Sequence, residues 1–255
     1  NVPGVLGRSV YPDGDGHALL SMGSGLITHQ TPVAERWGGY YVTGSIALPH
    51  LGNRTYVEAR EAMPETFAWK DLREKINVAK YPRATSDIVA LMVLEHQCQA
   101  HNLLTSAGLN YRRACYLGNA MDPQGNPDEG SAGRLADHAA AKIVEWFLFA
   151  GEADQGVDGV EGDEEFQKQF EASVPQTADG ESLADFQLNG RLFKNRCSYM
   201  IYSEAFQQLP APLKNRVIAG LRKVFEAATT DDAYPDIKLT ERRRIARILH
   251  ETGVW

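Results

Sequence analysis

Glycine and proline are unevenly spread along the 255 residues of this chain, and their spacing constrains the fold more than any other feature. In the first 60 residues, turn-forming pairs such as Pro3-Gly4, Asp13-Gly14 and Gly38-Gly39 separate short runs of β-prone residues. Breaks at such intervals leave room only for short strands and loops. The expected strands are 5–11, 18–22 and 40–43.

From residue 86 onward the pattern becomes helical. Thr85 or Ser86 can cap a helix that runs to about residue 117, with Asp87 favourably placed in its first turn. A second helix is expected over 134–151, where apolar residues recur every three or four positions. Further helices are expected over 164–173, 183–188, 198–209, 211–228 and 240–253. The sequence therefore predicts an α+β fold, with a mainly α-helical body and a small, irregular, β-rich N-terminal region.

Length and composition limit the class of protein. A single domain is expected across 1–255, with strand and loop over 1–60 and the helical body over 86–255. The chain starts at Asn1 and shows no charged segment followed by an apolar one, so we expect it to be the C-terminal part of a longer precursor. No apolar run approaches the roughly 18 residues of a membrane-spanning helix. The net charge of −7 argues against nucleic-acid binding, which depends on basic side chains.

The three cysteines form no Cys-x-x-Cys pair. Neither a zinc ribbon nor a covalent haem site is therefore expected from this chain alone. Each lies in a segment predicted to be helical, without an adjacent lysine that would favour the thiolate. We expect Cys98, Cys115 and Cys197 to be buried free thiols that react slowly.

The predicted helix from residue 86 carries polar side chains among its leucines. His96 and His101 lie about 140° apart around a helix, so they do not form the i, i+4 pair that binds one ion. Glu95 and Asn102 are two turns apart on one face. We expect all four to be mostly buried, either as a hydrogen-bonded core network or as the wall of a cofactor site or cleft. The candidate partners of a charged Glu95 are Arg36, Arg112 and the histidines.

Segment 29–44 is the most unusual part of the sequence, because two adjacent glycines precede two tyrosines among other aromatic and basic residues. Adjacent glycines let the backbone approach a flat partner closely. Histidine with large aromatic side chains suits a planar cofactor such as haem, so region 1–60 is expected to face the cofactor. The alternative is a tight structural turn against the core. The candidate cofactor-binding residues are His29, His50, Arg36, Trp37, Tyr40 and Met22, and the candidate metal ligands are His29, His50, His96, His101 and Glu95.

Six stretches cover the chain nearly end to end and share one resemblance. They are 2–16 (VPGVLGRSVYPDGDG), 29–44 (HQTPVAERWGGYYVTG), 50–53 (HLGN), 86–112, 191–210 and 248–253 (ILHETG). Here the sequence resembles a largely uncharacterised family of exported bacterial proteins with c-type cytochrome domains. The resemblance implies a periplasmic or exported protein of the bacterial envelope, a redox partner protein, and haem c attached through a Cys-x-x-Cys-His motif upstream of Val2.

This chain departs from the family pattern at two places. It contains no Cys-x-x-Cys-His motif, and it has SIALPH at 45–50, where the family has Thr-His-Gly before the second histidine. The resemblance implies haem c in the complete protein, whereas these departures lead us to expect no covalent haem on residues 1–255. The leading hypothesis is a haem-associated electron-transfer or redox-accessory module. The alternatives are a metal-dependent or other enzyme with a cleft walled by helix 95–102, and a structural interaction domain.

Overall fold

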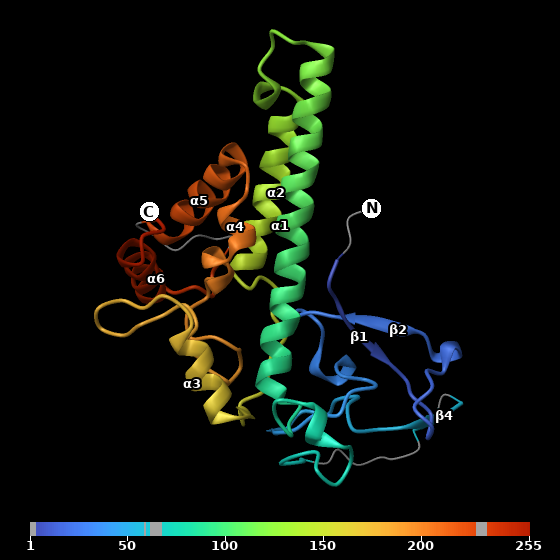
Figure 1. Cartoon of the computed structure of the whole chain (residues 1–255). Helices are drawn as coiled ribbons and strands as arrows, with labels where there is room; N and C mark the ends of the chain where they lie inside the picture. Colours follow the sequence, from blue (N-terminus) through green and yellow to red (C-terminus); the bar gives the residue numbers. More distant parts are fainter. Residues whose placement is uncertain (1–3, 59, 62–67, 228–233) are drawn as a thin grey trace.

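One long helix organises the molecule. The structure is a computed structural model that describes residues 4–58, 60–61, 68–227 and 234–255. Helix α1 (Ile88–Met121) has 34 residues, which corresponds to about 51 Å at ~1.5 Å per residue. The Asp87 side chain caps it by accepting a hydrogen bond from the Ala90 N–H at 2.9 Å. The N-terminal region lies against one side of α1, and most of the other helices lie on the opposite side (Figure 1).

The helices of the body pack on one another around an apolar core. Helix α2 (Ser131–Phe147) packs along α1, and α5 (Ala211–Phe225) packs on α2 and on α6 (Leu239–Glu251). The shorter helices are α3 (Glu164–Ala172) and α4 (Glu204–Gln207). Single 3-10 turns are η1 (Leu20–Met22), η2 (Val33–Glu35), η3 (Val78–Lys80), η4 (Pro127–Glu129) and η5 (Tyr199–Tyr202). No helix among the described residues has the length and apolar character needed to cross a membrane.

The strands form separate pairs of two. In the N-terminal region β1 (Gly7–Val10) pairs antiparallel with β2 (Ser24–Ile27), and Gly7 lies opposite Ile27. A shorter hairpin joins β4 (Tyr56–Val57) to β5 (Arg60–Glu61). The third pair connects the two regions, because β3 (Ser45–Ile46) pairs with β6 (Val160–Glu161) of the body.

The predicted fold class is confirmed: the chain is α+β and mainly helical, with its small sheets concentrated at the N-terminal end. Three expected elements take another form. Residues 18–22 contain η1 rather than a strand, and 40–43 contribute only an isolated bridge at Thr43. Residues 183–188 are not helical, because Phe186 forms a bridge with Phe193 and the Asp185 carbonyl accepts from the Lys194 N–H. Long-range pairing overrides local helix propensity there.

Candidate functional site

A buried arginine joins the N-terminal region to α1. Arg36 is 1% exposed, and its Nη1 donates to Glu95 Oε2 at 2.9 Å. Its Nε and Nη2 donate to the carbonyls of Thr31 (2.7 Å) and His29 (3.0 Å). Trp37 Nε1 donates to the other oxygen of Glu95. The expected burial of Glu95 with Arg36 as its partner is confirmed, and burial raises the pKa of Glu95 to about 7 against the opposing effect of Arg36.

Two histidines from distant parts of the chain meet beside this ion pair. His29 Nδ1 lies 2.9 Å from His96 Nδ1, and His96 Nε2 lies 2.6 Å from Ser198 Oγ. The ring centroid of His29 is 3.9 Å from that of Trp146, and the His96 centroid is 4.3 Å from that of Phe149. Burial lowers the pKa of His29 to about 3 and that of His96 well below its ordinary value. Both imidazoles are therefore neutral, so one Nδ1 donates and the other accepts.

His50 and Met22 lie apart from this pair. His50 Nδ1 accepts a hydrogen bond from the Gly52 N–H at 3.0 Å, and its ring meets the Trp37 ring edge-on with centroids 5.1 Å apart. Burial lowers the pKa of His50 to about 4. Met22 is half-buried at the end of η1. His50 therefore has a structural role at the turn, and it is not paired with His29.

The expected burial of four polar side chains on α1 is only partly correct. Glu95 and His96 are buried, but His101 is exposed, because its position about 140° around the helix turns it away from the core. Asn102 is half-buried and binds the backbone of Val5 through both ends of its amide, at 3.0 Å and 2.7 Å. These residues do not form a common wall of one cleft.

The proposed metal ligands do not gather into one site. Within the described ranges, a single group of three potential ligand side chains is close enough to share an ion, and its members were not among the candidates: Asp13, Asp15 and His17. That group is mostly exposed at a turn, where the Asp13 carboxylate accepts from backbone N–H groups of the same loop. The histidine pair has one nitrogen of each ring in mutual contact, which leaves no shared ion position between them.

The glycine-aromatic turn lines an open cleft of about 600 Å³ in the N-terminal region. A Cβ at Gly38 would clash with the Val10 carbonyl oxygen, and one at Gly39 would lie 2.6 Å from Val10 Cγ2. Gly39 also has φ of 85°, which favours glycine. The two glycines thus allow the turn to pack on β1, and it is the tyrosines after them that face the cleft.

Two aromatic rings form one wall of this cleft. The Tyr41 ring is 45% exposed and its centroid lies 5.4 Å from that of Trp69. Lys75 Nζ lies 4.8 Å from the Trp69 ring centroid, and the Trp69 carbonyl accepts from the Gly44 N–H at 3.0 Å. The cleft is completed by Tyr40, Asn53, Arg54, Thr55 and the loop 12–16. Sequence analysis missed Trp69, because nothing in the spacing of residues 60–85 relates it to the turn.

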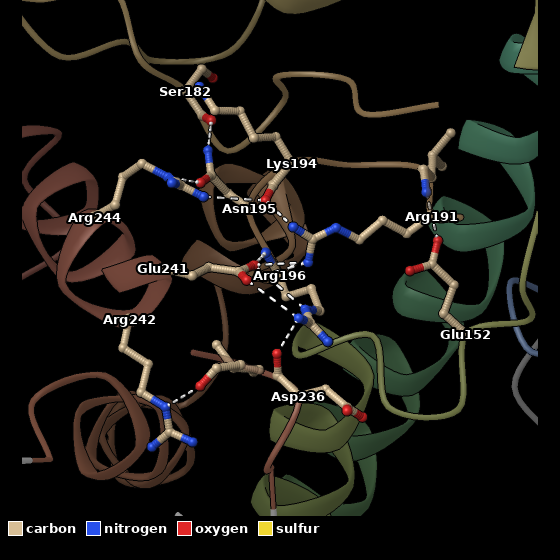
Figure 2. Close-up of polar contacts among 12 residues, drawn as sticks. Glu152, Ser182, Arg191, Lys194, Asn195, Arg196, Asp236, Glu241, Arg242 and Arg244 are labelled. Carbon is tan, nitrogen blue, oxygen red and sulfur yellow. Dashed lines mark hydrogen bonds and ion pairs between the residues drawn. The ribbon is translucent and has the colours of Figure 1, made fainter. Parts of the chain in front are cut away.

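A second buried polar cluster joins α6 to the segment 191–196 (Figure 2). Glu241 accepts from Arg191 Nη1 at 3.1 Å and from the Arg196 N–H at 2.9 Å. Arg244 Nε donates to Asn195 Oδ1 at 2.7 Å. Figure 2 also places Glu152 beside this cluster, where it accepts from the Leu192 N–H at 2.9 Å, and burial raises the pKa of Glu152 to about 7. All of these contacts join parts of the protein to one another, so the cluster has a structural role: it connects α6 and Glu152 to the segment 191–196.

The three cysteines are free thiols. Cys98 and Cys197 are buried as expected, whereas Cys115 is half-buried on the distal part of α1. Burial raises the pKa of both Cys98 and Cys197, which disfavours their thiolates.

Comparisons of the chain with known family models, curated proteins and solved structures find no match. We call the contact of Arg36 and His29 with Glu95 and His96 of α1 the junction. The geometry of the junction and of the cleft is therefore the basis for inferring function.

Proposed function

We propose that this chain is a non-catalytic, redox-accessory binding module that packs a planar cofactor in the cleft beside the turn 38–41. The observation that carries this proposal is the aromatic wall of Tyr41 and Trp69 in a cleft of about 600 Å³. Sites for organic ligands measure roughly 300–1,000 Å³ and combine aromatic walls with a few polar groups. Exposed ring faces pack against flat ligands in offset or tilted stacks.

The cleft suits the packing of a porphyrin ring better than the ligation of its iron. The described residues that line it include no histidine, cysteine or methionine; the one haem-ligand type among them is tyrosine, and the Tyr41 ring is packed against Trp69. His29 and His50, the candidate axial ligands, are buried in other contacts and line none of the cleft. The chain's own residues would therefore exclude water from a ring face. Lys75 would attract acidic substituents of the ring, and Asp13 and Asp15, which also line the cleft, would repel them. A haem held there would supply one-electron chemistry.

The enzyme alternative is less well supported, because its proposed catalytic side chains are enclosed. Glu95 is 4% exposed with both oxygens hydrogen-bonded, and His96 is fully buried against Ser198. A general acid or base has to come within hydrogen-bond reach of its substrate. The envelope location and the redox partner implied by the family resemblance belong to the same proposal as the binding module.

The test is a titration with haemin and with iron-free protoporphyrin IX, followed by quenching of tryptophan fluorescence. We expect the two to bind with affinities within about twofold of each other, since no histidine, cysteine or methionine lines the cleft within the described ranges. Tyr41→Ala and Trp69→Leu should each weaken the binding of both compounds by roughly 5- to 150-fold, the equivalent of one stacked ring at ~1–3 kcal/mol. For Trp69→Leu, porphyrin absorbance replaces fluorescence as the signal.

Tyr116→Ala is the matched control, because Tyr116 is 73% exposed on α1, outside the residues that line the cleft. It should leave both affinities unchanged. The proposal is overturned if the cleft variants bind porphyrin as tightly as the unaltered chain, or if only the iron-containing ring binds.

A further inference from the structure

The loop 50–53 lies against the backbone that carries the tyrosine side of the cleft wall. The Leu51 N–H donates to the Arg36 carbonyl at 2.9 Å, and the Asn53 N–H donates to the Tyr40 carbonyl at 3.0 Å. Asn53 is buried and belongs to the residues that line the cleft. The loop therefore follows the same backbone from the buried ion pair of Arg36 to the first tyrosine of the cleft.

The Asn53 side chain binds the next part of this backbone through both ends of its amide. Its Oδ1 accepts from the Val42 N–H at 2.8 Å, and its Nδ2 donates to the Val42 carbonyl at 2.9 Å. With the bond to the Tyr40 carbonyl, the peptide groups on both sides of Tyr41 are hydrogen-bonded to one residue. Because Asn53 is only 8% exposed, water competes little for these bonds.

Asparagine meets two requirements at position 53 that other residues do not meet together. Asn53 has φ of 63°, in the left-handed region that glycine, asparagine and aspartate adopt most readily. Its amide also supplies one donor and one acceptor side by side, as the two polar groups of Val42 require. Glycine would satisfy only the backbone requirement, and an ionised aspartate would lack the donor.

The backbone held by Asn53 carries two neighbouring side chains into different surroundings. Val42 is 1% exposed and belongs to the apolar core, and a Cβ added at Gly52 would lie 2.7 Å from Val42 Cγ2. Tyr41 is 45% exposed, and its ring reaches that of Trp69 with centroids 5.4 Å apart. The close contact of the loop with Val42 therefore determines where the Tyr41 ring emerges.

We propose that Asn53 is a positioning residue of the cleft: its amide fixes the backbone of Tyr41, so that the Tyr41 ring is in place beside Trp69 before a planar ligand binds. The ligand in this inference rests on the proposed function, whereas the contact between the two rings is present in the protein alone. A wall that is already ordered strengthens binding, because the ligand does not have to order it. Asn53 acts through Tyr41, since its own amide is directed at Val42.

The test measures the contact between the two rings and the affinity for protoporphyrin IX in the same variants. Asn53→Gly retains a backbone that tolerates positive φ and removes both side-chain hydrogen bonds. In the ligand-free protein, the nuclear Overhauser effect between the Tyr41 and Trp69 rings should weaken. Protoporphyrin IX should bind roughly 3- to 10-fold more weakly, the equivalent of ordering one side chain on binding. Asn53→Asp should show the same two changes, because a carboxylate cannot donate to the Val42 carbonyl.

Asn102→Ala is the matched control, because the Asn102 amide also binds a backbone through both of its ends, at Val5 and outside the residues that line the cleft. It should leave the ring contact and the affinity unchanged.

The inference is overturned if both Asn53 variants keep the ring contact of the unaltered chain, or if Asn102→Ala weakens that contact equally. It is also overturned if both Asn53 variants unfold, because Asn53 would then support the whole fold rather than the wall of the cleft. If the unaltered chain binds no porphyrin, the proposed function fails, and the ring contact still decides the role of Asn53.

Discussion

The N-terminal region and the helical body are stabilised by different kinds of contact. Polar side chains such as Glu241 and Arg242 are a minority of those buried in the helical body, and in α5 the buried residues are all apolar: Leu213, Val217, Leu221, Val224 and Phe225. In the N-terminal region the strands are only two to four residues long, and many of the buried side chains are polar: Ser9, His29, Arg36, Thr43, His50 and Asn53. Apolar cores tolerate substitutions of similar volume, whereas a buried polar network requires each donor and acceptor. The N-terminal region should therefore be the more sensitive to small chemical changes.

The largest effect is expected at the arginine between the two regions. Arg36→Met leaves Glu95 buried without its charged partner, which costs about 3–5 kcal/mol in the free energy of unfolding. The double variant Arg36→Met/Glu95→Leu should recover a substantial part of that loss, because no unpaired charge remains. Urea denaturation of the three proteins measures these differences.

A buried arginine of the body provides the comparison. Arg242 is fully buried and donates to the carbonyls of Ile237, Val224 and Tyr234, with no carboxylate among these partners. Arg242→Met should cost less than Arg36→Met, since it leaves neutral carbonyls rather than a charge without a partner. An equal or larger loss from Arg242→Met would contradict the proposed difference between the regions.

Acid should weaken the junction before it weakens α5 and α6. The folded state keeps His29 and His96 neutral, with the pKa of His29 near 3, whereas the unfolded chain protonates them near pH 6.5. The unfolded state therefore binds more protons, and the free energy of unfolding falls as the pH falls below 6.5. The raised pKa of Glu95, about 7, acts in the opposite direction between pH 4.5 and 7. Below pH 4.5 the histidine effect is no longer opposed by Glu95.

His29 should then contribute up to about 1.4 kcal/mol per pH unit between pH 4.5 and 3, and the lowered pKa of His96 acts in the same direction. Hydrogen exchange followed at about pH 5, 4.5, 4 and 3.5 tests the order of events. Amides of β1 and of the loop 28–36 should lose protection at a higher pH than amides of α5. Simultaneous loss in both places would show that the junction has no separate sensitivity to acid.

A smaller effect is expected where the amide of Asn102 binds the backbone of Val5. Asn102→Ala removes two hydrogen bonds, and we expect a local loss of about 1–2 kcal/mol in the protection of residues 5–7. The control is Asn110→Ala, which removes only an exposed contact with Ser106 on the same helix. Limited proteolysis near the N-terminus should distinguish the two variants. Equal cleavage rates would contradict the proposal that Asn102 holds the backbone around Val5 in place.

The smallest effect is the difference in reactivity among the three cysteines, which can be measured on the unaltered protein. Cys115 should react first with a thiol reagent in the folded protein, while Cys98 and Cys197 should react only after unfolding. Peptide mapping after partial labelling identifies the modified cysteine. Early labelling of Cys197 would mean that the body opens more readily than its apolar packing suggests.

The sequence predicted those features that depend on local pattern or on a single strong requirement. The spacing of apolar residues predicted α2. Burying a carboxylate is costly unless it is paired, so the sequence also predicted a positively charged partner for Glu95. The contact between His29 and His96 was not predictable in this way, because neutral rings impose no charge requirement across 67 residues. Trp69 likewise reaches the cleft only through the path of its loop, which depends on tertiary contacts rather than local propensity.

The guanidinium of Arg36 donates to three acceptors, and this has a consequence for the order in which the chain acquires its structure during synthesis. Its guanidinium binds two carbonyls of its own loop and a carboxylate that is translated 59 residues later. Until Glu95 has emerged from the ribosome, Arg36 lacks the carboxylate that it pairs with in the folded protein, so we expect its guanidinium to stay in water rather than become buried. The first part of the protein to be made should therefore be among the last to become rigid, after α1 has formed and presented Glu95.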